Sequence, residues 1–165
     1  MVQDGLIVWK CPIGPIQHTP NAYAAVYIRA YPPEHPDHDP SEVTVEAAAN
    51  TITTYLSGEE VGPLNRLASG EALAPSGVVI GVIIVSELAG NDEYEGGPWV
   101  TELFVDPAWH GLGVGTALIH FAVIQLALQN RLTLGLAVTV GSPAGRLYER
   151  LGFEERSKSW ALIID

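Results

Sequence analysis

Cysteine and basic side chains are scarce in this chain, and each scarcity excludes a class of structure or partner. The 165-residue sequence has a single cysteine, Cys11, so no disulfide can form within the chain. Eight Lys and Arg residues stand against 19 Asp and Glu residues, which gives a formal net charge of −11. Nucleic acids and anionic membranes are bound by clustered basic side chains, so we expect neither as a partner. The acidic balance instead favours a cationic ligand.

Long apolar runs are also missing. The longest, residues 78–85, is far below the roughly 20 residues that a membrane-spanning helix needs. The first residues lack a basic stretch followed by an apolar core, so no secretion signal is predicted. The 47% hydrophobic composition is enough to build one core. We therefore expect a single domain, residues 1–165, in a soluble cytoplasmic protein.

The most informative stretch is residues 99–116, WVTELFVDPAWHGLGVGT. Its first seven residues are β-branched or aromatic apart from Glu102 and Leu103, which is typical of a strand, and Pro107 cannot donate to a sheet partner. Glycines at 111, 113 and 115 then allow a close approach of the backbone to a ligand, and the apolar residues that follow predict a helix. The free N–H groups and dipole of a first helical turn favour a phosphate or pyrophosphate.

Two other phosphate-binding turns do not fit this stretch. A P-loop needs a lysine after its last glycine, but the chain has lysine only at Lys10 and Lys158. A dinucleotide-binding turn needs an acidic residue about 20 positions further on, and none lies between Asp106 and Glu149. The P-loop interpretation therefore fails, and a dinucleotide site is not favoured as the explanation of the glycines.

Two motifs carry a resemblance to a known family. Val105-x-Pro107 followed by HGLGVG at residues 110–115 resembles the acyl-CoA-binding motif of the GNAT superfamily of N-acetyltransferases. AGRLYERLGF at residues 144–153 is similar to the late helix of the same family. The sequence departs from the family pattern at His110, where Gln or Arg is usual, and at Gly141, where many members have Asn.

The resemblance implies an α/β fold with a mixed, strongly twisted sheet of six to seven strands. Helices would cover both faces, and a central parallel strand pair would splay to admit acyl-CoA. Acetyl-CoA would be the co-substrate, with no metal, and the backbone of residues 103–105 would pair with pantetheine like an added strand. The implied CoA-binding residues are Leu103, Phe104, Val105, His110, Gly111, Leu112, Gly113, Val114, Gly115 and Thr116.

Caps, prolines and hydrophobic periodicity predict the order of the elements. The predicted helices are one that begins after Thr19 and stops before Pro32, one from Asp39 to about Gly58, one at 116–129 that is buried on nearly all sides, and one capped by Ser142 that ends at Gly152. The predicted strands are 5–10, a short one at 64–69, 77–88, 99–105, 132–140 parallel to the central strand, and a closing pair at 153–156 and 160–164. A hairpin turn is expected at residues 91–97.

Three groups of side chains have competing interpretations. Tyr23, Tyr27 and Tyr31 recur every fourth residue, which favours core packing over the lining of a substrate cleft. The loop EHPDHDP at 34–40 collects His and Asp, but a proline-rich loop gives no fixed face for a metal. The acidic side chains of the 91–97 turn are expected to be solvated, with attraction of an ammonium substrate as the alternative.

Acyl transfer to an amine needs a base for the amine and an acid for the departing thiolate. Glu102 is the predicted base, because a carboxylate in an apolar strand is costly unless it is used or paired; its alternative is a solvent-facing position. Tyr148 is the predicted acid, since its pKa keeps it protonated and the resemblance puts it at the general-acid position; its alternative is the core.

The sequence therefore predicts an acetyl-CoA-dependent N-acetyltransferase that acts by direct attack of a small, cationic primary amine. The alternative is a non-catalytic acyl-CoA-binding or sensing module on the same fold, because fold does not fix function. A homodimer is left open.

Overall fold

A computed structural model describes residues 11–92 and 95–156 of the chain. The helices are α1 (Pro20–Ala30), α2 (Val45–Ser57), α3 (Val114–Leu128) and α4 (Ala144–Arg150). Two short 3-10 helices, η1 (Pro40–Glu42) and η2 (Pro107–Trp109), precede α2 and α3. The strands are β1 (Ile13–Pro15), β2 (Gly70–Leu73), β3 (Val79–Leu88), β4 (Gly97–Val105) and β5 (Gly135–Leu136).

The strands of the described residues form one sheet in the order β1-β2-β3-β4-β5. The first four strands pair antiparallel, whereas β4 and β5 are parallel through the pairs Trp99↔Gly135 and Val100↔Leu136. The predicted parallel strand pair is therefore confirmed, and β5 is the edge strand of the described sheet. The register of β4 with β5 ends at Val100, while β4 continues along β3 to Val105. The described strands thus leave the second half of β4 unpaired on its β5 side.

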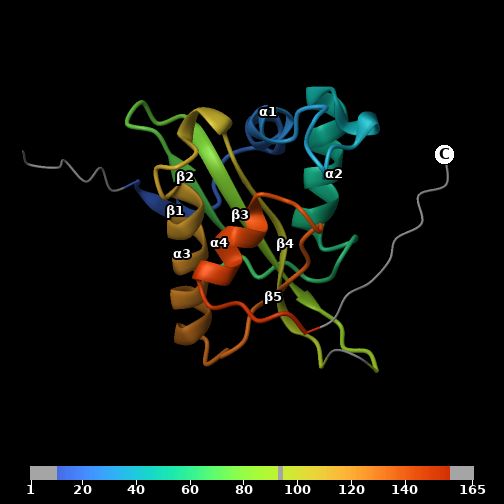
Figure 1. Ribbon diagram of the computed structural model, residues 1–165, viewed down its shortest axis with the longest axis vertical. Coiled ribbons are helices and arrows are strands. Elements are labelled where there is room, and N and C mark those ends of the chain that lie inside the picture. Colours follow the sequence, from blue (N-terminus) through green and yellow to red (C-terminus); the bar gives the residue numbers. More distant parts are fainter. Residues whose placement is uncertain (1–10, 93–94, 157–165) are drawn as a thin grey trace, which may run out of the picture.

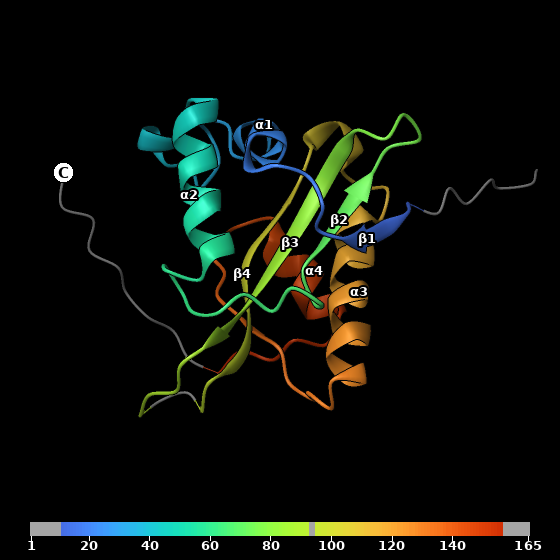
Figure 2. The ribbon, with the colours of Figure 1, turned by 180° about the vertical axis from the view of Figure 1, so that it is seen from behind.

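Helices cover both faces of the sheet, as predicted (Figures 1 and 2). α1 and α2 pack on one face against the side chains of Val82, Ile84 and Phe104. α3 and α4 pack on the other face against Ile83 and Val85. β3 is buried along most of its length because it lies between these two layers.

The strand predictions need three corrections. The described residues contain five strands, and the predicted strands 5–10 and 160–164 lie outside them; residues 153–156, predicted as a strand, form none. The expected strand at 64–69 contributes only the bridge Leu64↔Ser86, because Asn65 closes a turn by accepting from the backbone of Ala68 and Ser69. The strand in this part of the chain is β2, which begins after the predicted range, at Gly70. β5 is two residues long, since only these two find a partner on β4.

The helix predictions hold in position but not in every boundary. Asp39 caps η1 by accepting from the backbone N–H of Ser41, whereas α2 has its own cap, Thr44, which accepts from Ala47 N at 3.1 Å. The predicted 39–58 helix is therefore two elements. α4 begins at Ala144, and Ser142 Oγ accepts from the Ala144 N–H at 3.4 Å from just outside the cap position.

α3 differs from its prediction in two ways. It starts at Val114, two residues earlier than expected, with Gly113 as its N-cap. It is also not buried on nearly all sides, because Ile124 and Leu128 are 59% and 74% exposed. The absence of charge therefore indicated an apolar helix without showing how many of its faces are covered. No helix of the described residues is long and apolar enough to span a membrane.

Candidate active site

A β-bulge decides which face of the sheet receives Glu102. The register of β3 with β4 runs Ile84↔Glu102 and then Val85↔Val100, so Thr101 is an extra residue on β4. Without it, Val100 and Glu102 would point to the same face, because side chains alternate along a strand. With it, Val100 packs on the α3 side, whereas Glu102 meets α1.

The carboxylate of Glu102 is partly buried and is held by the C-terminal end of α1. The hydroxyl of Tyr31, the residue after α1, donates to Glu102 Oε1 at 2.5 Å and lies 3.3 Å from the carbonyl oxygen of Leu103. Burial raises the pKa of Glu102 to about 7, although the hydrogen bonds from Tyr31 and the Leu103 backbone act to lower it. The charges of Asp37 and Glu42 add to the upward shift. A carboxyl group with this pKa exchanges its proton near neutral pH, as a general base must.

The tyrosine stripe of α1 combines the two interpretations weighed for it. Tyr23 and Tyr27 are buried in the core, as the packing interpretation predicts. Each hydroxyl of the stripe also donates to a different carboxylate: Tyr23 to Glu71 at 2.5 Å, Tyr27 to Glu42 at 2.6 Å, and Tyr31 to Glu102 at 2.5 Å. The stripe is therefore a row of three Tyr–Glu pairs.

A pocket of about 130 Å³ lies beside the second and third of these pairs. Glu42 in its wall accepts from the hydroxyls of Tyr27 and Thr51, both at 2.6 Å. The rings of Tyr27 and Tyr31 meet edge to face at a centroid distance of 4.8 Å. The lining residues are Tyr27, Ile28, Tyr31, Pro32, Pro33, His38, Asp39, Glu42 and Val43. Aromatic faces next to carboxylates suit a cationic group.

The glycine turn lies at the end of β4, and its glycines serve two different needs. Gly111 and Gly113 have φ of +74° and +81°, a conformation that L side chains rarely adopt, and a Cβ at either position would meet open space. Gly115 is helical, and a Cβ there would lie 3.2 Å from Leu147 Cδ2 of α4. The first two glycines therefore shape the exposed turn, whereas Gly115 lets α4 approach α3.

A family model for the acetyltransferase (GNAT) domain matches residues 71–155, about half of the chain. The chain belongs to the GNAT acetyltransferase family. The matched region contains β4 with Glu102, the glycine turn, and α4 with Tyr148. Both motifs that carry the sequence resemblance lie within it.

Relatives and solved structures agree with this assignment. An uncharacterized N-acetyltransferase of Methanocaldococcus jannaschii is 38% identical over 68 residues, which cover 39% of this chain and 30% of that relative. A Pyrococcus horikoshii protein has the same fold, with a TM-score of 0.74 at 20% identity and coverage of 92% and 93%. The aminoglycoside 6'-N-acetyltransferase AAC(6')-Ih of Acinetobacter baumannii has a TM-score of 0.64 at 13% identity, with coverage of 94% and 99%.

A third similar structure has a ligand. AAC(6')-Iy, solved in complex with a bisubstrate analogue that contains CoA, has a TM-score of 0.64 at 18% identity, and the match covers 95% of this chain and 99% of that one. At this identity the likeness shows the fold alone. The predicted GNAT-like fold is therefore confirmed.

Tyr148 of the GNAT late helix is 8% exposed and packs edge to face on Phe153 at 5.6 Å. Burial, followed by the charges of Glu102 and Asp37, raises its pKa to about 12, so it is protonated at neutral pH.

The hydroxyl of Thr139 donates to the Asp37 carboxylate. This contact joins the loop after α1 to the segment that precedes α4.

His110 lies just before the glycines, with its side chain folded back onto β4. Its Nε2 is 3.0 Å from the carbonyl oxygen of Val105. Because a carbonyl can only accept, Nε2 is the donor in this contact. The carbonyl of Val105 thus has a side-chain donor in His110, whereas the Tyr31 hydroxyl near the Leu103 carbonyl donates its hydrogen to Glu102.

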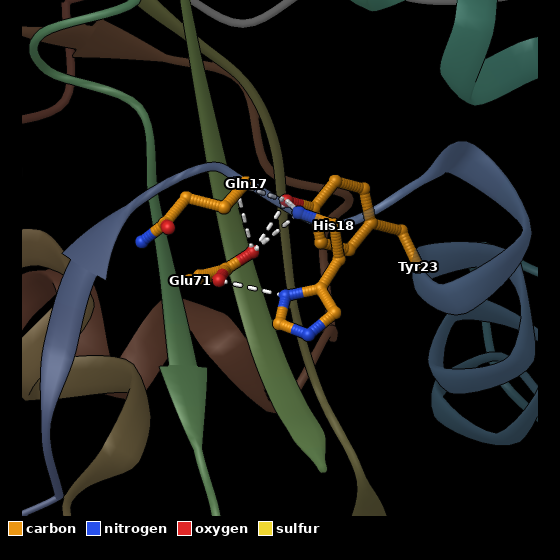
Figure 3. A network of polar contacts seen from close by, with 4 residues as sticks. All are labelled: Gln17, His18, Tyr23 and Glu71. Atoms are coloured by element: carbon orange, nitrogen blue, oxygen red, sulfur yellow. Dashed lines mark hydrogen bonds and ion pairs between the residues drawn. The ribbon is translucent and has the colours of Figure 1, made fainter. Parts of the chain in front are cut away.

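Sequence reasoning missed the buried carboxylate of Glu71 on β2 (Figure 3). It accepts from the Tyr23 hydroxyl, from the backbone N–H groups of Gln17 and His18 at 3.1 and 3.3 Å, and pairs with His18 Nδ1 at 2.8 Å. Burial acts to raise the pKa of Glu71, but these hydrogen bonds together lower it. The available signal was an acid between small and apolar residues, GEAL, the same signal that singled out Glu102.

Neither the 34–40 loop nor the 91–97 turn forms a binding site within the described residues. His35 Nδ1 lies 3.7 Å from Asp37, and no set of three or more potential metal ligands converges anywhere in the described chain. Asp92 and Glu95 of the 91–97 turn are exposed, as the solvated-loop interpretation expects, while Glu93 lies outside the described residues.

Proposed function

We propose that this protein transfers an acetyl group from acetyl-CoA to a primary amine of a small cationic molecule. The observation that carries the proposal is the state of Glu102: a partly buried carboxyl group with a pKa near 7, placed by a bulge beside the open edge of β4. Family membership supplies the reaction class, and this carboxyl supplies the base that the reaction needs.

Acetyl-CoA would bind along the second half of β4 and across the glycine turn. The backbone of Leu103, Phe104 and Val105 lies on the edge that β5 leaves unpaired, where an extended pantetheine can add as a strand. Residues 110–116 form the turn and the first residues of α3, whose N–H groups and dipole favour the pyrophosphate. AAC(6')-Iy, which shares the fold, is described in complex with CoA.

The chemistry would be a direct transfer. Glu102 accepts a proton from the ammonium substrate, and the free amine attacks the thioester carbonyl. The carbon–sulfur bond of the resulting intermediate breaks, and Tyr148 gives its proton to the departing thiolate. The extra proton that the attacking nitrogen still carries then leaves it to give the neutral amide, and it restores the Tyr148 hydroxyl. A backbone N–H of residues 103–105 that faced the thioester oxygen would stabilise the charge that develops there. The high pKa of Tyr148 keeps its proton available at neutral pH.

The substrate would be cationic because the surroundings of Glu102 are acidic and aromatic. Asp37 and Glu42 act on Glu102, and the pocket next to Tyr31 has tyrosine and carboxylate walls. Two proteins of the same fold are named as aminoglycoside 6'-N-acetyltransferases. An amine with several positive charges is therefore the first substrate class to test.

One observation favours the alternative, a GNAT module that binds acyl-CoA without turnover. Tyr148 is buried against Phe153, as a core tyrosine would be. In that case the protein would bind CoA, yet the thioester would persist with every amine.

The test is a panel of amines with acetyl-CoA, followed by thiol release. We expect an aminoglycoside or a linear polyamine to react faster than a neutral primary amine of similar size. Glu102→Gln should lower the rate by about 10²-fold or more and remove the acidic limb of the pH profile near pH 7, with CoA affinity retained. Thiol release at the background rate with every amine, despite CoA binding, would establish the binding module instead.

A further inference from the structure

Tyr31 links the end of α1 to the candidate base, Glu102. It follows the last residue of α1, and its backbone N–H donates to the carbonyl of Tyr27 at 3.1 Å. From there its hydroxyl reaches Glu102 Oε1 at 2.5 Å, across 71 residues of sequence. A charge-assisted contact of this length belongs to the strong class of hydrogen bonds.

The surrounding residues fix Tyr31 from several sides. Its ring packs edge to face on Tyr27 at 4.8 Å and on His35 at 5.0 Å. His38 Nδ1 lies 2.8 Å from its carbonyl oxygen, so the main chain is held as well. A donor held in this way loses little conformational freedom when it contacts Glu102, and it presents its hydroxyl in one direction.

The groups around Glu102 act in opposite directions on its charge. Tyr31 and the Leu103 backbone stabilise the carboxylate, whereas burial, Asp37 in the loop after α1 and Glu42 of η1 oppose it. The charge of Glu102 also raises the pKa of three nearby tyrosines, which therefore stay neutral: Tyr27 of α1, Tyr55 of α2 and Tyr148 of α4. Among the described residues, Tyr31 is therefore the side chain that donates a hydrogen bond to this carboxylate.

We propose that Tyr31 is a positioning residue for the acetyl-transfer site: its hydroxyl holds the carboxylate of Glu102 in the orientation in which it takes the proton of the amine. The role in turnover rests on the proposed function. The contact with Glu102 does not, so it can be measured in the protein without substrate.

The test is Tyr31→Phe, which removes the hydroxyl and keeps the ring contacts. Loss of a hydrogen bond to a charged group should raise the pKa of Glu102 by about one unit or more. Carbon-13 NMR of protein with labelled glutamate measures this pKa directly, and Glu102→Gln identifies the signal. In turnover, the acidic limb should move to higher pH by the same amount, so the loss of kcat/KM is larger at pH 6 than at pH 9.

Tyr27→Phe is the matched control, because it removes the hydroxyl one helical turn earlier, where the acceptor is Glu42. The pKa of Glu102 should move far less in Tyr27→Phe than in Tyr31→Phe. If Tyr31→Phe does not fold, 3-fluorotyrosine at position 31 keeps the shape and donates more strongly, so the pKa of Glu102 should fall instead.

The outcomes separate the two proposals. An NMR shift in Tyr31→Phe with no acetyl transfer by the parent protein would leave the contact standing and reject the proposed function. Acetyl transfer with an unmoved acidic limb and an unmoved Glu102 signal in folded Tyr31→Phe would overturn the role of Tyr31. Equal shifts in the Tyr31 and Tyr27 variants would overturn it too, since the effect would then be general packing.

Discussion

Glu71 accepts a hydrogen bond from Tyr23 of α1 and Glu102 from Tyr31, the residue after α1, yet their pKa values move in opposite directions. Burial on its own acts to raise the pKa of both carboxyl groups. Glu71 also has two backbone N–H groups and His18, and these donors together lower its pKa. Glu102 has fewer donors and faces the charges of Asp37 and Glu42. The number of donors thus leaves Glu71 ionised and Glu102 able to exchange its proton near neutral pH.

At the same scale, Tyr148→Phe tests the proposed acid. The variant keeps the ring contact with Phe153, so the fold should hold. If the hydroxyl protonates the thiolate, turnover should fall by about 10²-fold or more while CoA binds as before. Steady-state kinetics with acetyl-CoA and with a thioester of a more acidic thiol measures this, and the second donor should lose less rate. Unchanged turnover in folded Tyr148→Phe would make Tyr148 a core residue.

β4 carries most of the candidate site because its parts follow one another along this strand. The bulge at Thr101 turns Glu102 toward α1, the next residues have no β5 partner among the described strands, and the strand then leads through η2 into the glycine turn. Arg29 of α1 holds the end of this element through an ion pair with Asp106 at 2.8 Å. The proposed base and the expected phosphate turn are therefore fixed relative to each other.

The glycine turn gives a prediction at the scale of this element. Gly113→Val places a β-branched side chain where φ is +81°, so the turn must change shape at a cost of about 1–2 kcal/mol. We expect CoA affinity to fall by more than tenfold in calorimetry. Gly145→Ala is the control, since that helical glycine has open space around it and φ outside the positive range. Equal CoA affinity in folded Gly113→Val and in the parent would remove the turn from the binding site.

Gly115→Ala is expected to act differently from the Gly113 variant. Its new Cβ would meet the end of the Leu147 side chain at 3.2 Å, which can shift by a few tenths of an ångström. The helix conformation favours Ala over Gly by about 1 kcal/mol. The variant should fold well and keep CoA affinity within a few fold by calorimetry. A tenfold loss would show that the ligand needs the space at Gly115.

For the whole molecule, the network around Glu71 predicts a dependence of stability on pH. The lowered folded pKa means that this carboxylate stabilises the fold above its unfolded pKa of about 4.5. That contribution is lost as the pH falls through the folded pKa. Glu71→Gln should cost about 1.5–3 kcal/mol at pH 7 and should weaken the loss of stability in acid. Urea unfolding between pH 3 and 7 measures both effects.

Glu95→Gln is the matched control for this prediction, because Glu95 is exposed in the 91–97 turn. It should unfold at the same urea concentration as the parent at every pH. If Glu71→Gln behaves in the same way, the buried network contributes nothing to the free energy of unfolding.

The sequence predicted those parts of the fold whose causes are local. Prolines and caps placed α1 and α4, and apolar runs placed β3 and β4. It could not predict the extent of β5 or the bulge at Thr101, because both depend on pairing with a distant strand. The Tyr–Glu pairs have the same origin: Tyr31 and Glu102 are 71 residues apart, and periodicity alone does not name a partner.

The row of three Tyr–Glu pairs also fixes the position of α1 along its own axis. The three tyrosines are four residues apart, which in a helix is a rise of about 6 Å per step of the backbone, and each hydroxyl donates to a carboxylate on a different element. A slide of the helix would break all three contacts together and leave three carboxylates without these donors. The three contacts therefore favour a single position of α1 on the sheet, because no other position keeps all three donors on their carboxylates.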